Sequence, residues 1–117
     1  MREIEEFRRV LREAPEVVRR YAYLDDLERR ARRIWEKLKE DCRLDAYEVQ
    51  WFYTLLRDLE TVLQEECGDN RELCEKYFRF IADVNNEFLE TTADIIMNHC
   101  CRCKLDVEPC TLFKMKR

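Results

Sequence analysis

Apolar residues recur every three or four positions along most of the chain, which is the spacing of one buried face on an amphipathic α-helix. This pattern covers residues 2–13 and is interrupted at Pro15. It resumes in a second segment, 15–41, whose first residue is this proline. Proline is tolerated in the first turn of a helix but not in its interior, so a kink or restart is expected there. Two more periodic segments cover residues 45–66 and 71–98. The pattern predicts a short N-terminal helix and three long helices.

Polar residues at the segment ends support these boundaries. Asp45 is suited to cap the N-terminus of one helix, with Glu48 as the second member of a capping box. Gly68 is suited to end that helix in a left-handed conformation, and Asp69 or Asn70 to cap the next one. Because short connections make neighbouring helices antiparallel, we predict an all-α fold: an antiparallel bundle of three long helices plus a short N-terminal helix.

The helical period is lost at the C-terminal end of the chain. Residues 100–117 contain four cysteines and Pro109, which blocks a regular helix, so an irregular Cys-rich tail is expected. A length of 117 residues suits one domain, and we expect 1–117 to form a single helical-bundle domain. One Gly, two Pro and no Ser leave few residues for turns.

The composition favours helices with ionised outer faces. Charged residues make up 41% and hydrophobic residues 46% of the chain, whereas disorder requires low hydrophobicity. The net charge of −4 is the sum of about +1 over 1–41, −8 over 42–98 and +3 over 99–117. Nucleic-acid binding requires an excess of basic residues, so nucleic acid is not an expected partner except through the basic tail. Abundant Glu and Arg without Ser are typical of hyperthermophile proteins, and we expect a thermophilic archaeal or archaeal-virus source, with a designed helical bundle as the alternative.

No apolar run approaches the about 18 residues that a membrane-spanning helix needs. The first residues also lack the apolar core of a signal peptide. We therefore expect no membrane association and a cytoplasmic location. Secretion is the alternative, because a signal peptide could have been removed already.

The seven cysteines fall at two poles if neighbouring helices are antiparallel. Cys67 and Cys74 flank the turn between the last two helices, so their Cα atoms could come within the about 4.4–6.8 Å of a disulfide. We predict a disulfide there, with two reduced thiols as the alternative.

The other pole should hold Cys42 and the tail cysteines. The predicted disulfide partner of Cys42 is one of three tail cysteines, Cys100, Cys101 or Cys103, and a further bond from Cys110 could hold the tail. Because seven is odd, at least one cysteine is left over or pairs between molecules. A structural zinc prefers four N or S ligands, and the alternative to disulfides is a zinc ion held by His99, Cys101, Cys103 and Cys110. The CxC pattern is less specific for zinc than two CxxC pairs, so we expect no cofactor. Inert thiols are a third alternative for these cysteines. We expect His99 to be a capping or surface residue.

Charged clusters on the helices predict solvated surface. A carboxylate stripe lies opposite the apolar face of the last helix and consists of Asp83, Glu87, Glu90 and Asp94. The chain has no Glu-x-x-His motif of the kind that di-iron bundles need. Arginines interleaved with acidic residues predict a salt-bridged surface at Arg29, Arg30, Arg32 and Arg33. Since the chain also lacks Ser, a Gly-rich phosphate loop and an HExxH motif, we do not expect an enzyme.

Aromatic and aliphatic residues widen the apolar arcs of 45–66 and 71–98 beyond what three helices can cover. On the first of these helices the additional residues are Tyr47, Trp51, Leu55 and Val62. We interpret the large aromatics as core or boundary residues: Trp35, Trp51, Tyr21, Tyr23 and Tyr53. The excess apolar surface predicts a homodimer or a protein partner, and thus a non-catalytic interaction or structural protein that self-associates.

Two alternatives come from other functional classes. Long helices with cysteines at their ends and a bridged tail are broadly similar to short-chain four-helix cytokines. That resemblance implies a secreted ligand with four helices, the first of which residues 2–13 would have to supply. The other alternative is a small zinc-stabilised accessory protein that contacts nucleic acid through its tail.

Overall fold

The computed structural model describes residues 2–20 and 22–100, and in this part of the chain it contains helices and no strand. The helices are α1 (Arg2–Leu11), the single turn α2 (Glu16–Arg19), α3 (Tyr23–Asp41), α4 (Ala46–Cys67), α5 (Arg71–Ile95) and a π-helical turn, η1 (Ile96–Cys100). The predicted all-α class, with three long helices and a short N-terminal helix, is confirmed. The predicted tail beyond residue 100 lies outside the described residues.

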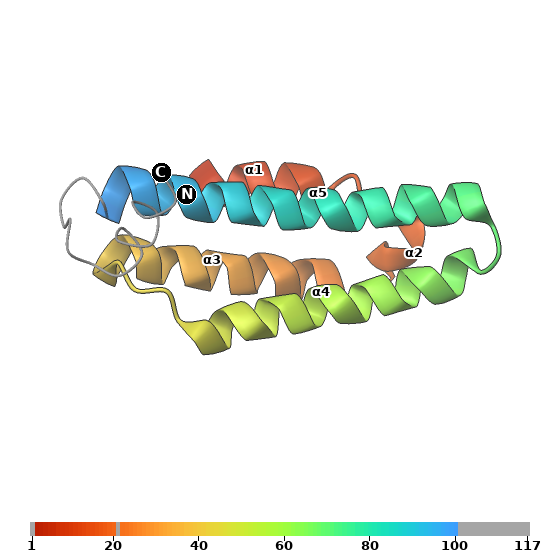
Figure 1. Cartoon of the computed structure of the whole chain (residues 1–117), viewed down its shortest axis with the longest axis horizontal. Helices are drawn as coiled ribbons and strands as arrows, with labels where there is room; N and C mark the ends of the chain where they lie inside the picture. The colour runs from red at the N-terminus through yellow and green to blue at the C-terminus, as the bar shows by residue number, and fades with distance from the viewer. Residues whose placement is uncertain (1, 21, 101–117) are drawn as a thin grey trace, which may run out of the picture.

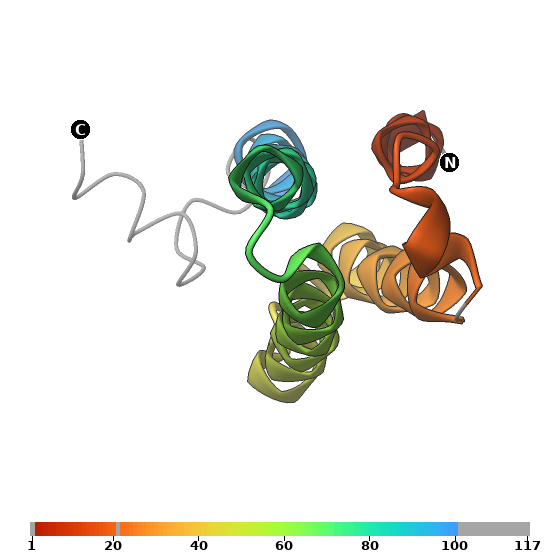
Figure 2. The ribbon, with the colours of Figure 1, turned by 90° about the vertical axis from the view of Figure 1, so that its right-hand side faces the viewer.

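Successive long helices alternate in direction, and α1 runs beside them as a short fourth rod (Figure 1). It packs against α3 and α5, whereas α2 lies further along the bundle against α3 and α4. The end-on view shows α1 and α5 above α3 and α4 (Figure 2). Together, α1 and α2 supply the apolar cover that three long helices leave missing on one side.

The centre of the bundle is a cluster of aromatic rings, one from each of four helices. Phe7, Trp35, Phe52 and Phe88 are each at most 2% exposed. The rings of Phe52 and Phe88 stack with centroids 4.0 Å apart, and Phe7 meets Trp35 edge-on at 5.4 Å. The indole Nε1 of Trp35 donates a hydrogen bond to the hydroxyl of Thr92 at 3.0 Å. The one polar atom of the Trp35 ring is therefore satisfied inside the core.

The predicted helix over 15–41 is wrong in one respect, because it is divided in two. The restart at Pro15 is confirmed, but α2 ends at Arg19 and α3 begins only at Tyr23. The division lets α2 pack against both α3 and α4, where the side chain of Val18 is completely buried. Periodicity does not reveal this break, because apolar residues continue at helical spacing on both sides of it.

The predicted N-caps of α4 and α5 are confirmed. The Asp45 carboxylate accepts hydrogen bonds from the backbone N–H groups of Tyr47 (2.9 Å) and Glu48 (3.3 Å). The Asn70 side-chain oxygen accepts one from the N–H of Leu73 at 3.1 Å. The capping-box role predicted for Glu48 is wrong, because its carboxylate is buried against α3 instead.

The helix C-termini differ in detail from the sequence expectation. Gly68 has the predicted positive φ of 51°, but its ψ of −124° lies outside the left-handed helical region. The left-handed residue is Cys42, with φ 53° and ψ 37°, where α3 ends. The last long helix, predicted to end near 98, changes at Ile96 into the wider turn η1, which buries both Ile96 and Cys100.

Candidate functional site

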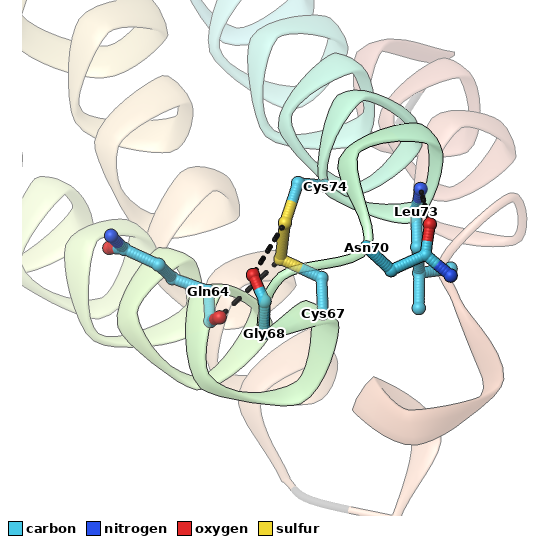
Figure 3. Close-up of a disulfide and its surroundings, with 6 residues drawn as sticks. All are labelled: Gln64, Cys67, Gly68, Asn70, Leu73 and Cys74. Carbon is cyan, nitrogen blue, oxygen red and sulfur yellow. Dashed lines mark hydrogen bonds between the residues drawn. A yellow bond between two sulfur atoms is a disulfide. The ribbon is translucent and has the colours of Figure 1, made fainter.

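One pole of the bundle is the turn between α4 and α5 (Figure 3). The Cα atoms of Cys67 and Cys74 lie 5.2 Å apart there, which is a disulfide distance. Cys67 is 4% exposed and ends α4, and Cys74 lies half-buried at the start of α5. Between them, Gly68 supplies a positive φ and Asn70 caps α5. The tight reversal therefore brings together the two thiols that the sequence predicted as a pair.

The opposite pole contains the second pair of cysteines. The Cα atoms of Cys42 and Cys100 are 5.5 Å apart, although 58 positions separate them in the sequence. Their exposed fractions are 9% and 0%. Of the alternatives for Cys42, the structure places Cys100 at disulfide distance. The remaining candidates lie outside the described residues: Cys101, Cys103 and Cys110.

His99 lies beside this second pair and faces the end of α3. Its Nε2 is 2.6 Å from the backbone carbonyl oxygen of Lys39. The last carbonyl groups of a helix have no partner within the helix, so the imidazole N–H can satisfy one of them. This contact supports a capping role. In residues 2–20 and 22–100 no group of three or more His, Cys, Asp or Glu side chains is placed to hold a metal ion, and the other three predicted zinc ligands fall beyond that part.

A polar hollow of about 520 Å³ opens near the same pole, between α1, α3 and α5. It is lined by Arg2, Glu3, Glu6, Lys39, Thr91, Asp94, Ile95, Asn98 and His99. Several of its charges neutralise each other, since Lys39 Nζ lies 2.7 Å from Glu3 Oε1 and Arg2 Nε lies 3.7 Å from Glu6 Oε1. The hollow thus holds an ion pair between α1 and α3.

The Glu3–Lys39 pair makes folding sensitive to acid. Burial by itself raises the pKa of Glu3, but the hydrogen bond from Lys39, with smaller electrostatic contributions, leaves this pKa below its ordinary value of 4.5. A carboxyl group with a lowered pKa stabilises the fold above its unfolded-state pKa, and this contribution is lost as the pH falls through the folded-state pKa. Glu3→Gln should therefore lower the free energy of unfolding at pH 7, and reduce the loss of stability on the acid side of about pH 4.5.

Urea unfolding at a series of pH values between about 7 and 3 measures this effect. The exposed carboxylate of Glu13 offers a matched control. Glu13→Gln should leave the decrease in the free energy of unfolding at acidic pH nearly unchanged. The prediction would be contradicted if the free energy of unfolding of Glu3→Gln decreased at acidic pH by as much as that of the parent protein.

A buried carboxylate lies between α3 and α4, where Glu48 of α4 faces the arginines of α3. Glu48 is 7% exposed, and its Oε1 lies 3.0 Å from Nε of Arg33 while its Oε2 lies 3.6 Å from a terminal nitrogen of Arg30. The guanidinium carbon of Arg30 is also 4.2 Å from the centroid of the Trp51 ring. This distance is typical of a cation–π contact. Arg30 therefore contacts both the buried carboxylate of Glu48 and the ring of Trp51.

Beside this ion cluster three large apolar side chains are exposed, two on α4 and one just before it. Leu44, Tyr47 and Trp51 are 41%, 76% and 53% exposed, and we call these three residues the aromatic face. Tyr47 and Trp51 are four positions apart and therefore lie on one side of α4, and Leu44 precedes the N-cap of the helix. Tyr47 and Trp51 therefore belong to the apolar surface that the three long helices were expected to leave uncovered, whereas Trp51, expected as a core or boundary residue, is exposed. No helix in the described part of the chain covers this flank of α4.

The pairing of the buried Glu48 with Arg30 and Arg33 was not predicted from the sequence, although a signal for it was present. Glu48 precedes Phe52 by four positions and Leu59 by eleven, so it follows the spacing of the buried residues. A carboxylate at a core position must be paired, because an isolated charge is expensive to bury. The four arginines of α3 were the only dense supply of cations nearby in the sequence.

The other flank of α4 faces α5 across a shallow groove of about 400 Å³. Phe78 contributes to its lining and is 38% exposed, and Leu89 lies further along α5 with 50% exposure. The Oδ1 of Asn85, which also lines the groove, is buried without a hydrogen-bond partner in the described part of the chain. The groove is thus a second exposed apolar surface, separated from the aromatic face by the width of α4.

The remaining predicted residues are found in the core, at its edge or at the surface. Trp35 is fully buried, and Tyr23 and Tyr53 are half-buried against the core, as predicted. Nothing is described for the side chain of Tyr21. In the carboxylate stripe Asp83, Glu90 and Asp94 are exposed, and Glu87 is half-buried and accepts a hydrogen bond from the Thr91 hydroxyl at 3.3 Å.

None of the helices in the described part of the chain has the length and apolar character needed to cross a bilayer. Because it exposes two large aromatic side chains beside the arginines of α3, the aromatic face is the strongest candidate for a functional site. No protein-family model, no curated protein and no solved structure matches this chain.

Proposed function

We propose that this protein is a non-catalytic helical bundle, stapled by disulfides, that acts as an interaction protein and pairs with a second copy of itself. The observation that carries the proposal is the aromatic face, where Tyr47 and Trp51 each expose more than half of a large ring. Tyr, Trp and Arg are the residue types that dominate binding energy at protein interfaces. All three types meet on this flank of α4, because Arg30 lies over Trp51.

Trp51 has a contact within the chain that restrains its ring, which favours association. Arg30 lies over the Trp51 ring and beside the buried carboxylate of Glu48. A side chain that is restrained before binding loses less conformational entropy when a partner covers it. The Trp51 ring therefore offers apolar area to a partner at a smaller entropic penalty than an unrestrained side chain.

Composition and cysteine placement support a hot intracellular setting for this protein. Disulfides are rare in the cytosol of mesophiles, but hyperthermophilic archaea and bacteria are an exception. Two staples at opposite poles of a highly charged bundle suit such a protein, or one from an archaeal virus. The fold gives no support to the cytokine alternative, because cytokine bundles run up-up-down-down and the helices here alternate in direction (Figure 1).

Molar mass measured by light scattering over about 1–100 µM tests the proposal, because self-association depends on concentration. We expect twice the mass of one chain at the upper end of this range. Trp51→Glu should shift the protein to the monomer, whereas the control Leu89→Glu, at an equally exposed site on α5, should not. Non-reducing gels identify any covalent dimer. A single-chain mass at every concentration would refute self-association.

A further inference from the structure

The aromatic face continues along α4 as a stripe whose character changes from one end to the other. Within α4, the residues on this side follow at intervals of three or four: Tyr47, Trp51, Leu55, Asp58 and Val62. The first half of the stripe is apolar and strongly exposed, and the second half contains the exposed carboxylate of Asp58. The stripe therefore has an aromatic end and an acidic end.

The flank of α3 beside this stripe carries cations near the aromatic end. Arg33 lies at the aromatic end, next to Glu48, and keeps 62% of its side chain exposed. Lys37 lies further toward the same end and pairs with Asp45. Because α3 and α4 are antiparallel, the acidic end of the stripe faces the N-terminal part of α3, where Asp26 pairs with Arg29. The surface therefore has the exposed Arg33 near its aromatic end and the exposed Asp58 near its acidic end.

Such a surface is complementary to itself when two copies are related by a two-fold axis that sets the α4 helices antiparallel. With the axis at the level of residue 53, Trp51 and Leu55 are both two positions from the centre. Tyr47 is six positions from the centre and Asp58 is five. At about 1.5 Å per residue, Asp58 of one copy then lies at the level of Tyr47 and Arg33 of the other.

We infer that a second copy of this chain covers the aromatic face in this antiparallel arrangement, with Asp58 of each copy beside Arg33 of the other. The inference rests on the self-association proposed above and adds its geometry. A parallel arrangement would place Arg33 against Arg33 and Asp58 against Asp58, and like charges facing each other disfavour a complex. An exposed aromatic ring contributes about 150–250 Å² at most, whereas a stable interface covers about 800 Å² per partner, so the charged ends must take part.

Charge reversal at the two positions tests this geometry. Arg33→Asp places two carboxylates opposite each other at both ends of the dimer, and Asp58→Arg places two cations there. Each variant alone should dimerise at least about tenfold more weakly than the parent protein. In an equimolar mixture of the two variants, every Asp again faces an Arg, so the mixture should form heterodimers with nearly the parent affinity. Sedimentation velocity over a dilution series measures both effects.

Two controls separate the geometry from changes in net charge or folding. Arg9→Asp on α1 and Asp83→Arg on α5 make the same charge changes on exposed positions outside the stripe, and they should leave dimerisation unchanged. Because Arg33 also pairs with Glu48 in its own chain, the thermal unfolding of each variant is followed by circular dichroism. Recovery of the dimer in the mixture shows directly that both variants are folded.

The failures of the two proposals are distinguishable. A dimer that persists unchanged in both charge variants, or a mixture that does not recover, overturns the antiparallel geometry and leaves self-association standing. A parent protein that remains a monomer overturns both. If Trp51 in that monomer is protected from an aqueous quencher until residues 101–117 are removed, the face belongs to the chain's own tail, and the inference is equally overturned.

Discussion

Replacing Trp35 by alanine should lower the free energy of unfolding by about 3–5 kcal/mol, the range for large aromatic side chains removed from a core. The ring is completely buried, contacts Phe7 and Phe88, and donates its N–H to Thr92. Its removal leaves a cavity where α1, α3 and α5 meet. Urea unfolding followed by circular dichroism, at a concentration where the protein is a monomer, measures the loss.

The chain contains its own control for this substitution, because it has two tryptophans. Trp51→Ala removes the same side chain from a position that is 53% exposed, and should change the free energy of unfolding by less than about 1 kcal/mol. Trp35→Phe keeps an aromatic ring but loses the hydrogen bond to Thr92, so an intermediate loss is expected. Equal losses for the two alanine variants would show that the aromatic cluster is not the centre of the core.

Breaking the Cys42–Cys100 link should be more destabilising than breaking the Cys67–Cys74 link. A cross-link stabilises a protein mainly by limiting its unfolded chain, and the effect grows with the length of the closed loop. The first pair is separated by 58 positions and the second by 7. The loop-entropy relation then gives about 4 kcal/mol for the first pair and about 2.5 kcal/mol for the second.

The variants that measure this are the double replacements Cys42→Ala with Cys100→Ala, and Cys67→Ala with Cys74→Ala. Thiol alkylation followed by intact-mass measurement without reductant establishes which bonds form in the parent protein. Cys42 has a left-handed conformation, so Cys42→Gly in the Cys100→Ala background should be more stable than Cys42→Ala by about 1 kcal/mol. Equal losses on breaking the two links, or four freely alkylated thiols at these positions, would contradict the prediction.

The long helices and the positions of the cysteines could be predicted because both depend on local features. The apolar spacing of α4 and α5, the cap at Asp45 and the turn at Gly68 are all contained within a few neighbouring residues. Once the helices alternate in direction, their lengths bring Cys42 to the same pole as Cys100. The division of α2 from α3 could not be predicted, because the burial of Val18 depends on α4, which is distant in sequence.

The amino-acid sequence by itself determined the number of long helices, their order and the separation of the cysteines between two poles. It also showed that α4 has more apolar surface than one neighbour can cover. Only the tertiary structure decided which flank of α4 remains open, and therefore that Trp35 is buried while Trp51 is exposed. The physical reason is that helical periodicity places a residue on a face of its own helix, whereas burial depends on which other helices pack against that face.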